Sequence, residues 1–198
     1  MTTARPRRRT GVGVLRVVGP PYARTAANVV AVLALLSLGL AALVDAVAVA
    51  VAALVLGALT LARVLAVPAG LQALLGATAL VAAWSSALLL YERLWWLDIA
   101  VHLTLNGVLA AVAGELVRRG RLVPPGDDPR GRWGLALTTT AVGTSLAAAW
   151  EVAEWIGHAY VDPTVHVTPA DTAGDLVAGA VGSAVAGLVL ARRAGSGR

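Results

Sequence analysis

Long apolar segments alternate with short polar breaks along most of the chain, and this pattern predicts the fold. Each apolar segment is about 18–24 residues long, the length that an α-helix needs to cross roughly 30 Å of hydrocarbon. We therefore predict an all-α fold, a polytopic membrane helix bundle with six transmembrane helices. The predicted helices cover residues 25–44, 47–67, 70–90, 97–117, 134–157 and 172–191.

Composition supports a membrane protein built as one bundle. Hydrophobic residues make up 58% of the 198 residues, whereas a soluble domain is nearer to about 45–50% apolar. The mean hydropathy of the chain is +0.77. The sequence contains no cysteine, which excludes disulfides and metal sites built on thiolates.

The arginines predict how the bundle lies in the membrane. They gather in residues 1–24, at Arg63, in residues 118–132 and after residue 191, and Arg93 is the one exception. Cytoplasmic segments of membrane proteins carry an excess of positive charge. We therefore expect both termini on the cytoplasmic side of a bacterial inner membrane. The expected division is a basic tail, 1–24, a transmembrane domain, 25–192, and a second cytoplasmic tail, 193–198.

The basic charge raises two alternatives, a nucleic-acid partner and a cleavable signal. The sequence pI is near 10.9, but the arginines flank predicted spans without interleaved aromatic residues, so we expect no nucleic-acid binding. A twin-arginine or secretory signal at 1–24 is the other alternative. Against it, the apolar run 25–44 is long enough to span the membrane and ends at Asp45 without a clear cleavage site.

Polar side chains divide the predicted bundle into two halves. The helices within 25–90 carry few of them and are expected to form an apolar scaffold, whereas the helices within 97–191 carry nearly all the acids of the spans. An unneutralised charge in hydrocarbon costs roughly 2.5 kcal/mol or more, so the functional site is expected in the second half. We find no internal repeat, which weakens the interpretation as an inverted-repeat transporter.

The acids of the second half fall on three helix faces at the same predicted membrane depth. Residues three or four apart share one face of a helix. Small residues follow the two aspartates on the face of the last helix and favour close helix contact. With the predicted orientation, all these side chains lie at the external ends of their helices. The candidate residues are Asp98, His102 and Asn106, then Glu151, Glu154 and His158, and finally Asp171 and Asp175.

So many acids at one depth require a counter-charge. Two carboxylates about 6 Å apart repel each other by about 3 kcal/mol at an effective dielectric of 20. Proton sharing, pairing with a base and metal binding are the three ways to relieve this repulsion, and Arg93, His158 and His166 are too few to balance the cluster. We therefore expect a divalent metal ion: Mg²⁺, Mn²⁺ or Ca²⁺ for the oxygen ligands, or Zn²⁺ or Fe²⁺ because of the imidazole. The expected metal ligands are Asp98, His102, Glu151, Glu154, Asp171 and Asp175, with Asn106 and His158 in secondary positions.

Taken singly, each candidate has a structural alternative. His102 alone would be a buried histidine with satisfied hydrogen bonds, and Asn106 alone would bridge two helices. Asp171 alone would cap the last helix or lie in its first turn, and Glu154 alone would face water at the interface. Glu115 differs from the others because it lies at the inner end of its helix, where we expect an ion pair with the neighbouring arginines.

Several short motifs recur together in the second half. An aromatic residue and an aspartate precede a histidine one turn on, followed by a glycine and a glutamate. An aromatic-Glu-x-x-Glu-Trp segment, an Asp-Thr-x-x-Asp segment and a glycine-rich final helix complete the pattern. Here these residues are Trp96, Asp98, His102, Gly107 and Glu115, the segments Trp150–Trp155 and Asp171–Asp175, and Gly182.

Over residues 90–192 this pattern resembles the bacterial inner-membrane YjdF-like family of unknown function, and more distantly VanZ-like membrane proteins. The residue after the aspartate is often basic in the family and is Ile99 here. The resemblance implies a six-helix membrane fold. It implies no established activity.

The leading functional hypothesis is a metal-dependent membrane enzyme of the hydrolase type that acts on a lipid or lipid-linked substrate at the external leaflet. Glu151, Glu154 and His102 are the expected catalytic residues. The ion would activate water or hold a phosphate, and an unligated carboxylate of the glutamate pair would accept a proton. Two alternatives stay open: a transporter for divalent cations or protons, and a non-catalytic scaffold whose ion holds helices together. Membrane lipids are the expected partners in each case.

Overall fold

The computed structural model describes residues 17–126, 128–163, 165 and 167–196. Within these residues every regular element is a helix, which confirms the all-α class. Parts of the predicted tails, residues 1–16 and 197–198, lie outside the described residues, as does His166. The helices are α2 (Pro21–Ala41), α3 (Ala46–Val64), α4 (Ala69–Ala87), α5 (Leu90–Arg93), α6 (Leu97–Arg119), α7 (Pro129–Tyr160) and α8 (Pro169–Gly195).

Five of these helices, α2, α3, α4, α6 and α8, are long and apolar enough to cross a membrane. This confirms the prediction of a multi-pass membrane helix bundle. Helix α7 has 32 residues but is not one of the five, because polar side chains interrupt its apolar sequence. Two of them, Thr139 and Glu151, are buried inside the bundle. The sixth span and the orientation of the termini therefore stay predictions.

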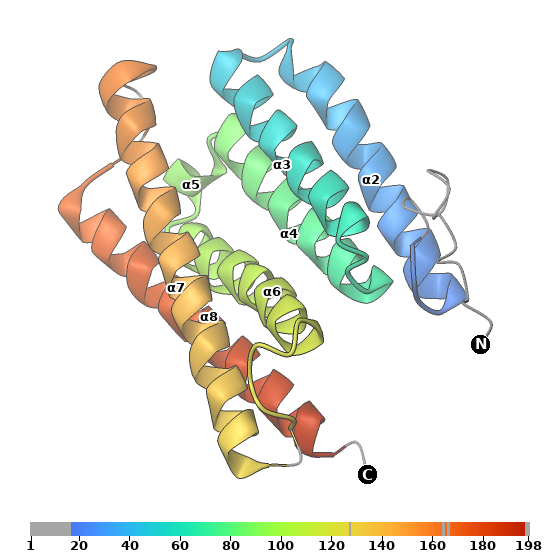
Figure 1. The fold of residues 1–198 in the computed structure, drawn as a ribbon. Helices are drawn as coiled ribbons and strands as arrows, with labels where there is room; N and C mark the ends of the chain where they lie inside the picture. The colour runs from blue at the N-terminus through green and yellow to red at the C-terminus, as the bar shows by residue number, and fades with distance from the viewer. Residues whose placement is uncertain (1–16, 127, 164, 166, 197–198) are drawn as a thin grey trace.

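The helices form two groups that are joined through α4 and α6. Figure 1 shows α2, α3 and α4 side by side, with α6, α7 and α8 in a second group and the short helix α5 between them. In the first group, Ala34, Leu59 and Leu75 are buried at the centre of an apolar core. Apolar side chains of α6, Leu105 and Leu109 among them, pack against that core. The first group therefore supports α6 from one side, and α7 and α8 contact it from another.

Capping residues fix where α7 and α8 begin. The Asp128 carboxylate accepts a hydrogen bond of 2.8 Å from the backbone N–H of Arg130, and the Thr168 hydroxyl accepts one of 3.2 Å from that of Asp171. A proline follows each cap at the first helical position, where its missing N–H does no harm. The starts predicted at 134 and 172 were therefore too late, because the caps precede the apolar runs.

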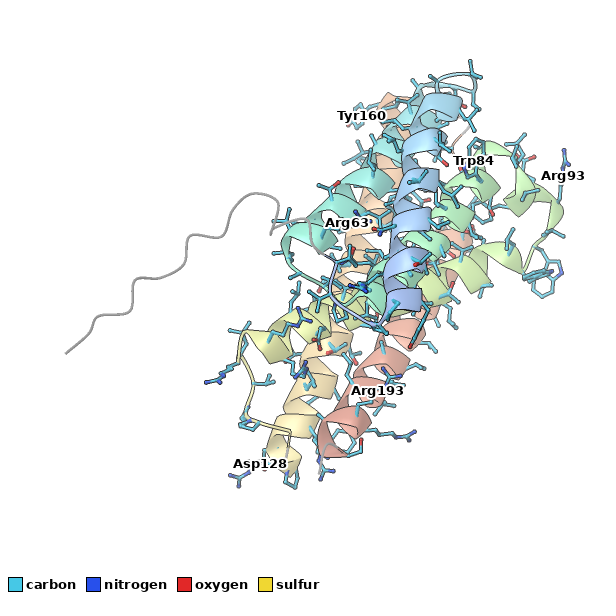
Figure 2. The ribbon with its side chains drawn as sticks, turned by 90° about the vertical axis from the view of Figure 1, so that its right-hand side faces the viewer. Arg63, Trp84, Arg93, Asp128, Tyr160 and Arg193 are labelled. Carbon is cyan, nitrogen blue, oxygen red and sulfur yellow. The ribbon has the colours of Figure 1, made fainter. Side chains whose placement is uncertain are left out.

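The candidate site residues and the arginines lie at opposite ends of the second group. Figure 2 shows Asp128 and Arg193 at one end of the molecule and Tyr160 at the other, so α7 runs along its length. Near the arginine-rich end, Glu115 pairs with Arg118 at 2.8 Å and with Arg119 at 2.6 Å, which confirms the expected ion pair. Each of α6, α7 and α8 thus has basic residues at one end and candidate site residues at the other.

Glycines bring α6 and α8 into backbone contact. A Cβ atom added at Gly107 would lie 3.1 Å from the carbonyl oxygen of Gly182, and one added at Gly182 would meet the carbonyl oxygen of Leu103. A Cβ added at Gly179 would lie 2.8 Å from the Cβ of Ala147 in α7. The predicted small-residue face of α8 is therefore the surface that packs against both neighbouring helices, as small residues do in membrane bundles.

Candidate functional site

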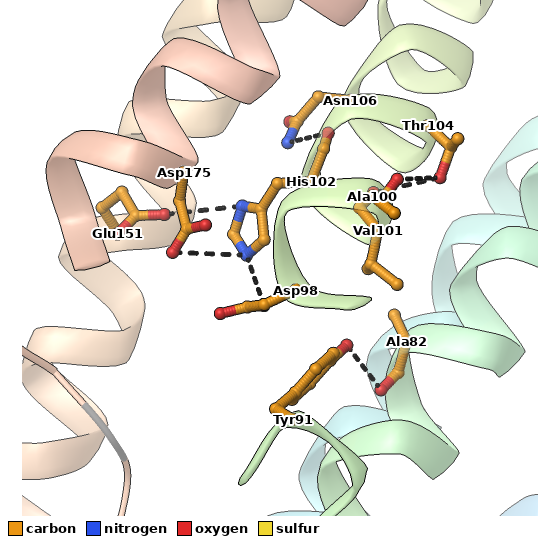
Figure 3. A network of polar contacts seen from close by, with 10 residues as sticks. All are labelled: Ala82, Tyr91, Asp98, Ala100, Val101, His102, Thr104, Asn106, Glu151 and Asp175. Atoms are coloured by element: carbon orange, nitrogen blue, oxygen red, sulfur yellow. Dashed lines mark hydrogen bonds and ion pairs between the residues drawn. The ribbon is translucent and has the colours of Figure 1, made fainter. Parts of the chain in front are cut away.

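His102 lies at the centre of the candidate site and is only 8% exposed. Its Nε2 atom lies 3.5 Å from Oδ1 of Asp98 and 3.8 Å from Oδ2 of Asp175, and its Nδ1 atom lies 3.7 Å from Oε1 of Glu151. Figure 3 shows the carboxylates on both sides of the imidazole ring. One imidazole therefore contacts carboxylates from α6, α7 and α8.

Helix geometry explains this convergence. Asp98 and His102 are four residues apart at the start of α6, so their side chains share one face. Asp175 lies in the second turn of α8, one turn before Gly179, where that helix contacts α6 and α7. Glu151 continues the face of α7 that carries Ala147. The buried contacts of Gly179 and Ala147 thus set the depth at which the carboxylates meet the imidazole.

Two overlapping groups of side chains are close enough together to hold a metal ion. One group is Asp98, His102 and Asp175, and the other is His102, Glu151 and Glu154; within each, one potential ligand atom per residue lies within 4.8 Å of the others. Two atoms bound to one tetrahedral ion at about 2.1 Å lie about 3.4 Å apart. The separation of 3.5 Å between His102 and Asp98 is close to that distance, and exceeds the usual length of a hydrogen bond.

Two buried polar atoms at the site have no hydrogen-bond partner among the described residues. They are Nδ1 of His102 and Oε1 of Glu151, which lie opposite each other. An unsatisfied buried polar group costs about 1–3 kcal/mol, so such atoms are uncommon unless something else binds to them. Asp175 is buried as well, at 2% exposure. The cluster therefore combines acids with atoms that still lack a partner.

Two predicted ligands occupy the edge of the cluster. Glu154 is half-buried beside Glu151 and belongs to the second group. Asp171 lies in the first turn of α8 and in neither group. Its backbone N–H is hydrogen-bonded to Thr168. Asp171 therefore has the position of a first-turn acid of the last helix, which was the structural alternative expected for it.

The two secondary residues make local hydrogen bonds. The Asn106 side chain donates to the backbone carbonyl of His102 at 3.0 Å, within α6, and packs against Gly179. Asn106 was expected, as the structural alternative, to bridge two helices. The hydrogen bond that its side chain donates stays within α6 instead. His158 forms a hydrogen bond of 2.7 Å through Nδ1 with the carbonyl oxygen of Val165, which closes the loop after α7. Neither residue belongs to the two groups around His102.

Sequence reasoning missed Tyr91, which lies at the border of the site. Its hydroxyl donates a hydrogen bond of 3.2 Å to the carbonyl of Ala82, and Figure 3 shows its ring beside Asp98. Burial raises the pKa of Tyr91 above its usual range, and the charges of Asp98 and Glu154 raise it further. Its position just before the polar pair Glu92 and Arg93, at the end of a predicted span, is the signal that could have identified it.

Comparison with known proteins places the chain in a family. A family model described as "Predicted membrane protein (DUF2238)" matches residues 22–196, from the first turn of α2 to just beyond α8. No curated protein and no solved structure matches the chain. The match agrees with the resemblance to YjdF-like membrane proteins of unknown function. Because it covers most of the sequence and every helix that carries the site, the chain belongs to this family of predicted membrane proteins.

Proposed function

We propose that this protein is a metal-dependent membrane enzyme of the hydrolase type, with a divalent ion held in the cluster around His102. The observation that carries the proposal is the convergence of Asp98, Glu151 and Asp175 on one buried imidazole. A divalent cation would offset the repulsion among these acids. Of the six ligands expected from the sequence, Asp171 is the one outside both groups.

A divalent ion supplies Lewis acidity, because it polarises a phosphoryl or carbonyl oxygen and lowers the pKa of water. The side chains around it supply the remaining functions. Asp98, His102 and Asp175 offer ligand atoms from two helices. Glu154 is less buried than Glu151 and lies next to it, so it is the carboxylate best placed to accept a proton from an attacking water.

The surroundings of the cluster favour a lipid or lipid-linked substrate. Large apolar side chains next to the acids along α6 and α7 are exposed, and aromatic residues are typical of the membrane interface. A molecule with a polar head could present that head to the acids while its apolar chain lies along these side chains. The exposed residues are Trp96, Ile99, Val152, Trp155 and Ile156.

Packing along the bundle favours an enzyme over a transporter. Beyond the cluster, towards the arginine-rich end, a Cβ added at Gly107 would press on Gly182, and one added at Gly143 would meet Ser183. The helices thus leave little room for an ion to move between them. Glu115, the next acid along α6, is already paired with two arginines. These contacts support a site that is reached from one face of the membrane.

The test uses purified full-length protein reconstituted in vesicles of bacterial polar lipid that contain lipid-linked phosphates. Mass spectrometry of the lipids is expected to reveal products that form only with added Mn²⁺ or Zn²⁺ and are reduced at least tenfold by Glu154→Gln. Asp45→Asn is the matched control, because Asp45 caps α3 away from the cluster and asparagine caps equally well.

Each rival gives a different result in the same vesicles. A transporter would accumulate Mn²⁺ in the lumen and leave the lipids unchanged. A scaffold would bind the ion and gain stability, with neither products nor flux. Either result with the wild-type protein, obtained for every lipid class in the vesicles, would contradict the proposed hydrolase.

A further inference from the structure

We infer that the ion binds His102 through Nε2, together with Asp98 and Asp175, and that Glu151 is a positioning residue that accepts a hydrogen bond from Nδ1. This inference rests on the proposed metal site. It divides the acids around the imidazole into ligands and an orienting partner, whereas the sequence treated them all as ligands.

The Nε2 side of the ring has the features of a coordination site. Asp98 and Asp175 approach Nε2 from α6 and α8 at 3.5 and 3.8 Å. The Asp98 side chain is 26% exposed, so water and substrate can reach this side. Three protein ligands and one open position are typical of catalytic metal sites. The exposed edge of Asp98 is where that open position would lie.

The Nδ1 side is closed instead. Nδ1 of His102 and Oε1 of Glu151 are both cut off from solvent and have no hydrogen-bond partner among the described residues. An ion on this side would lack the water that completes a catalytic coordination shell. The separation of 3.7 Å exceeds the upper length of an N–H···O hydrogen bond by about 0.5 Å. A small movement of the ring towards Glu151 would therefore satisfy both atoms at once.

Metal chemistry gives Glu151 a role in that arrangement. A histidine that binds a metal through one ring nitrogen usually donates the N–H of the other to a carboxylate, which fixes the tautomer and the ring orientation. Loss of such an orienting partner typically weakens metal affinity by about 10–100-fold. Glu151 would thus hold His102 in place from α7, and Glu154 beside it would stay unligated, as the proposed proton acceptor requires.

The experiment uses full-length protein labelled with ¹⁵N-histidine, in detergent, with one equivalent of Zn²⁺. The ring signals of His102 are assigned as those that are present in the wild-type spectrum and absent from the spectrum of His102→Gln. We expect the metal-shifted signal at Nε2 and a protonated Nδ1. In Zn²⁺ titrations, Asp175→Asn is expected to lose stoichiometric binding. Glu151→Gln is expected to keep it with a Kd about 10–100-fold weaker, and Asp45→Asn should match the wild type.

The outcomes separate this inference from the function on which it rests. A metal-shifted signal at Nδ1, or complete loss of Zn²⁺ binding in Glu151→Gln, would overturn the assignment but keep the metal site. Failure of the wild-type chain to bind Zn²⁺ or Mn²⁺ would overturn both. The tautomer is read from the wild-type protein, so a substitution of Asp175 or Glu151 that prevents folding leaves this part of the test intact.

Discussion

The Nε2 atom of His102 lies 3.8 Å from Oδ2 of Asp175, although the two residues belong to different helices. They meet because α6 and α8 are in backbone contact at Gly107 and Gly182, about one to two turns further along each helix. The site therefore depends on the packing of glycines that carry no chemistry of their own. Its stability and its metal affinity should change together when that packing changes.

The first prediction concerns this glycine contact. Gly182→Ala should lower the free energy of unfolding by about 1–3 kcal/mol, because the added methyl group would press on the carbonyl of Leu103. It should also weaken Zn²⁺ binding, since the imidazole and Asp175 would be pushed apart. Thermal unfolding in detergent and a Zn²⁺ titration measure the two effects. Gly57→Ala is the control, because nothing lies within 4 Å of the added atom; equal behaviour of the two variants would refute the prediction.

The second prediction concerns removal of the ion. A ligand present at 100 times its Kd stabilises the folded state by about 2.7 kcal/mol. Treatment of metal-loaded wild-type protein with EDTA should therefore lower its unfolding temperature by several degrees. Asp175→Asn should respond little, since it cannot hold the ion. An identical response in both proteins would show that the chelator acts elsewhere.

The third prediction concerns topology, and the absence of cysteine from the sequence makes it straightforward to test. Single-cysteine variants at three exposed positions, Leu43→Cys, Leu122→Cys and Tyr160→Cys, report on both ends of the bundle. With a membrane-impermeant maleimide, Leu43→Cys and Tyr160→Cys should label in intact cells, and Leu122→Cys only after permeabilisation. If α7 does not span the membrane, Leu122→Cys and Tyr160→Cys will label from the same side.

The fourth prediction separates stability from the site. Glu115→Gln removes the negative charge that pairs with Arg118 and Arg119 and should lower the free energy of unfolding by about 1.5–3 kcal/mol, the value of hydrogen bonds to charged groups. Zn²⁺ affinity should be unchanged, because Glu115 lies at the opposite end of α6 from His102. Unfolding and titration of the same preparation test both statements. A parallel loss of affinity would mean that the two ends of α6 are coupled.

Apolar periodicity was sufficient to predict the helices and most of the cluster. Hydropathy places spans where long apolar segments occur, and spacings of three and four place Asp98 beside His102 and Glu151 beside Glu154 on their helices. The small-residue face of α8 predicted which side of that helix packs inward. These features depend only on residues close together along the chain, so they can be predicted from a single sequence.

Contacts that depend on the relative position of the helices could not be predicted in this way. Tyr91 reaches the site because the chain turns at Leu89, whose φ of 54° lies in the left-handed region. His158 binds the carbonyl of Val165 instead of joining the cluster, because the loop after α7 folds back onto that helix. Asn106 binds a carbonyl of its own helix. Periodicity does not indicate which backbone groups will compete for a polar side chain.

Metal content of the purified protein tests the central claim most directly. After loading with Mn²⁺ or Zn²⁺ and removal of free ions, elemental analysis should find about one divalent ion per chain in the wild-type protein and in Asp45→Asn. Asp175→Asn should retain far less, because it lacks a carboxylate that lies 3.8 Å from Nε2 of His102. A wild-type protein without bound ion, or equal metal content in wild type and Asp175→Asn, would contradict the account.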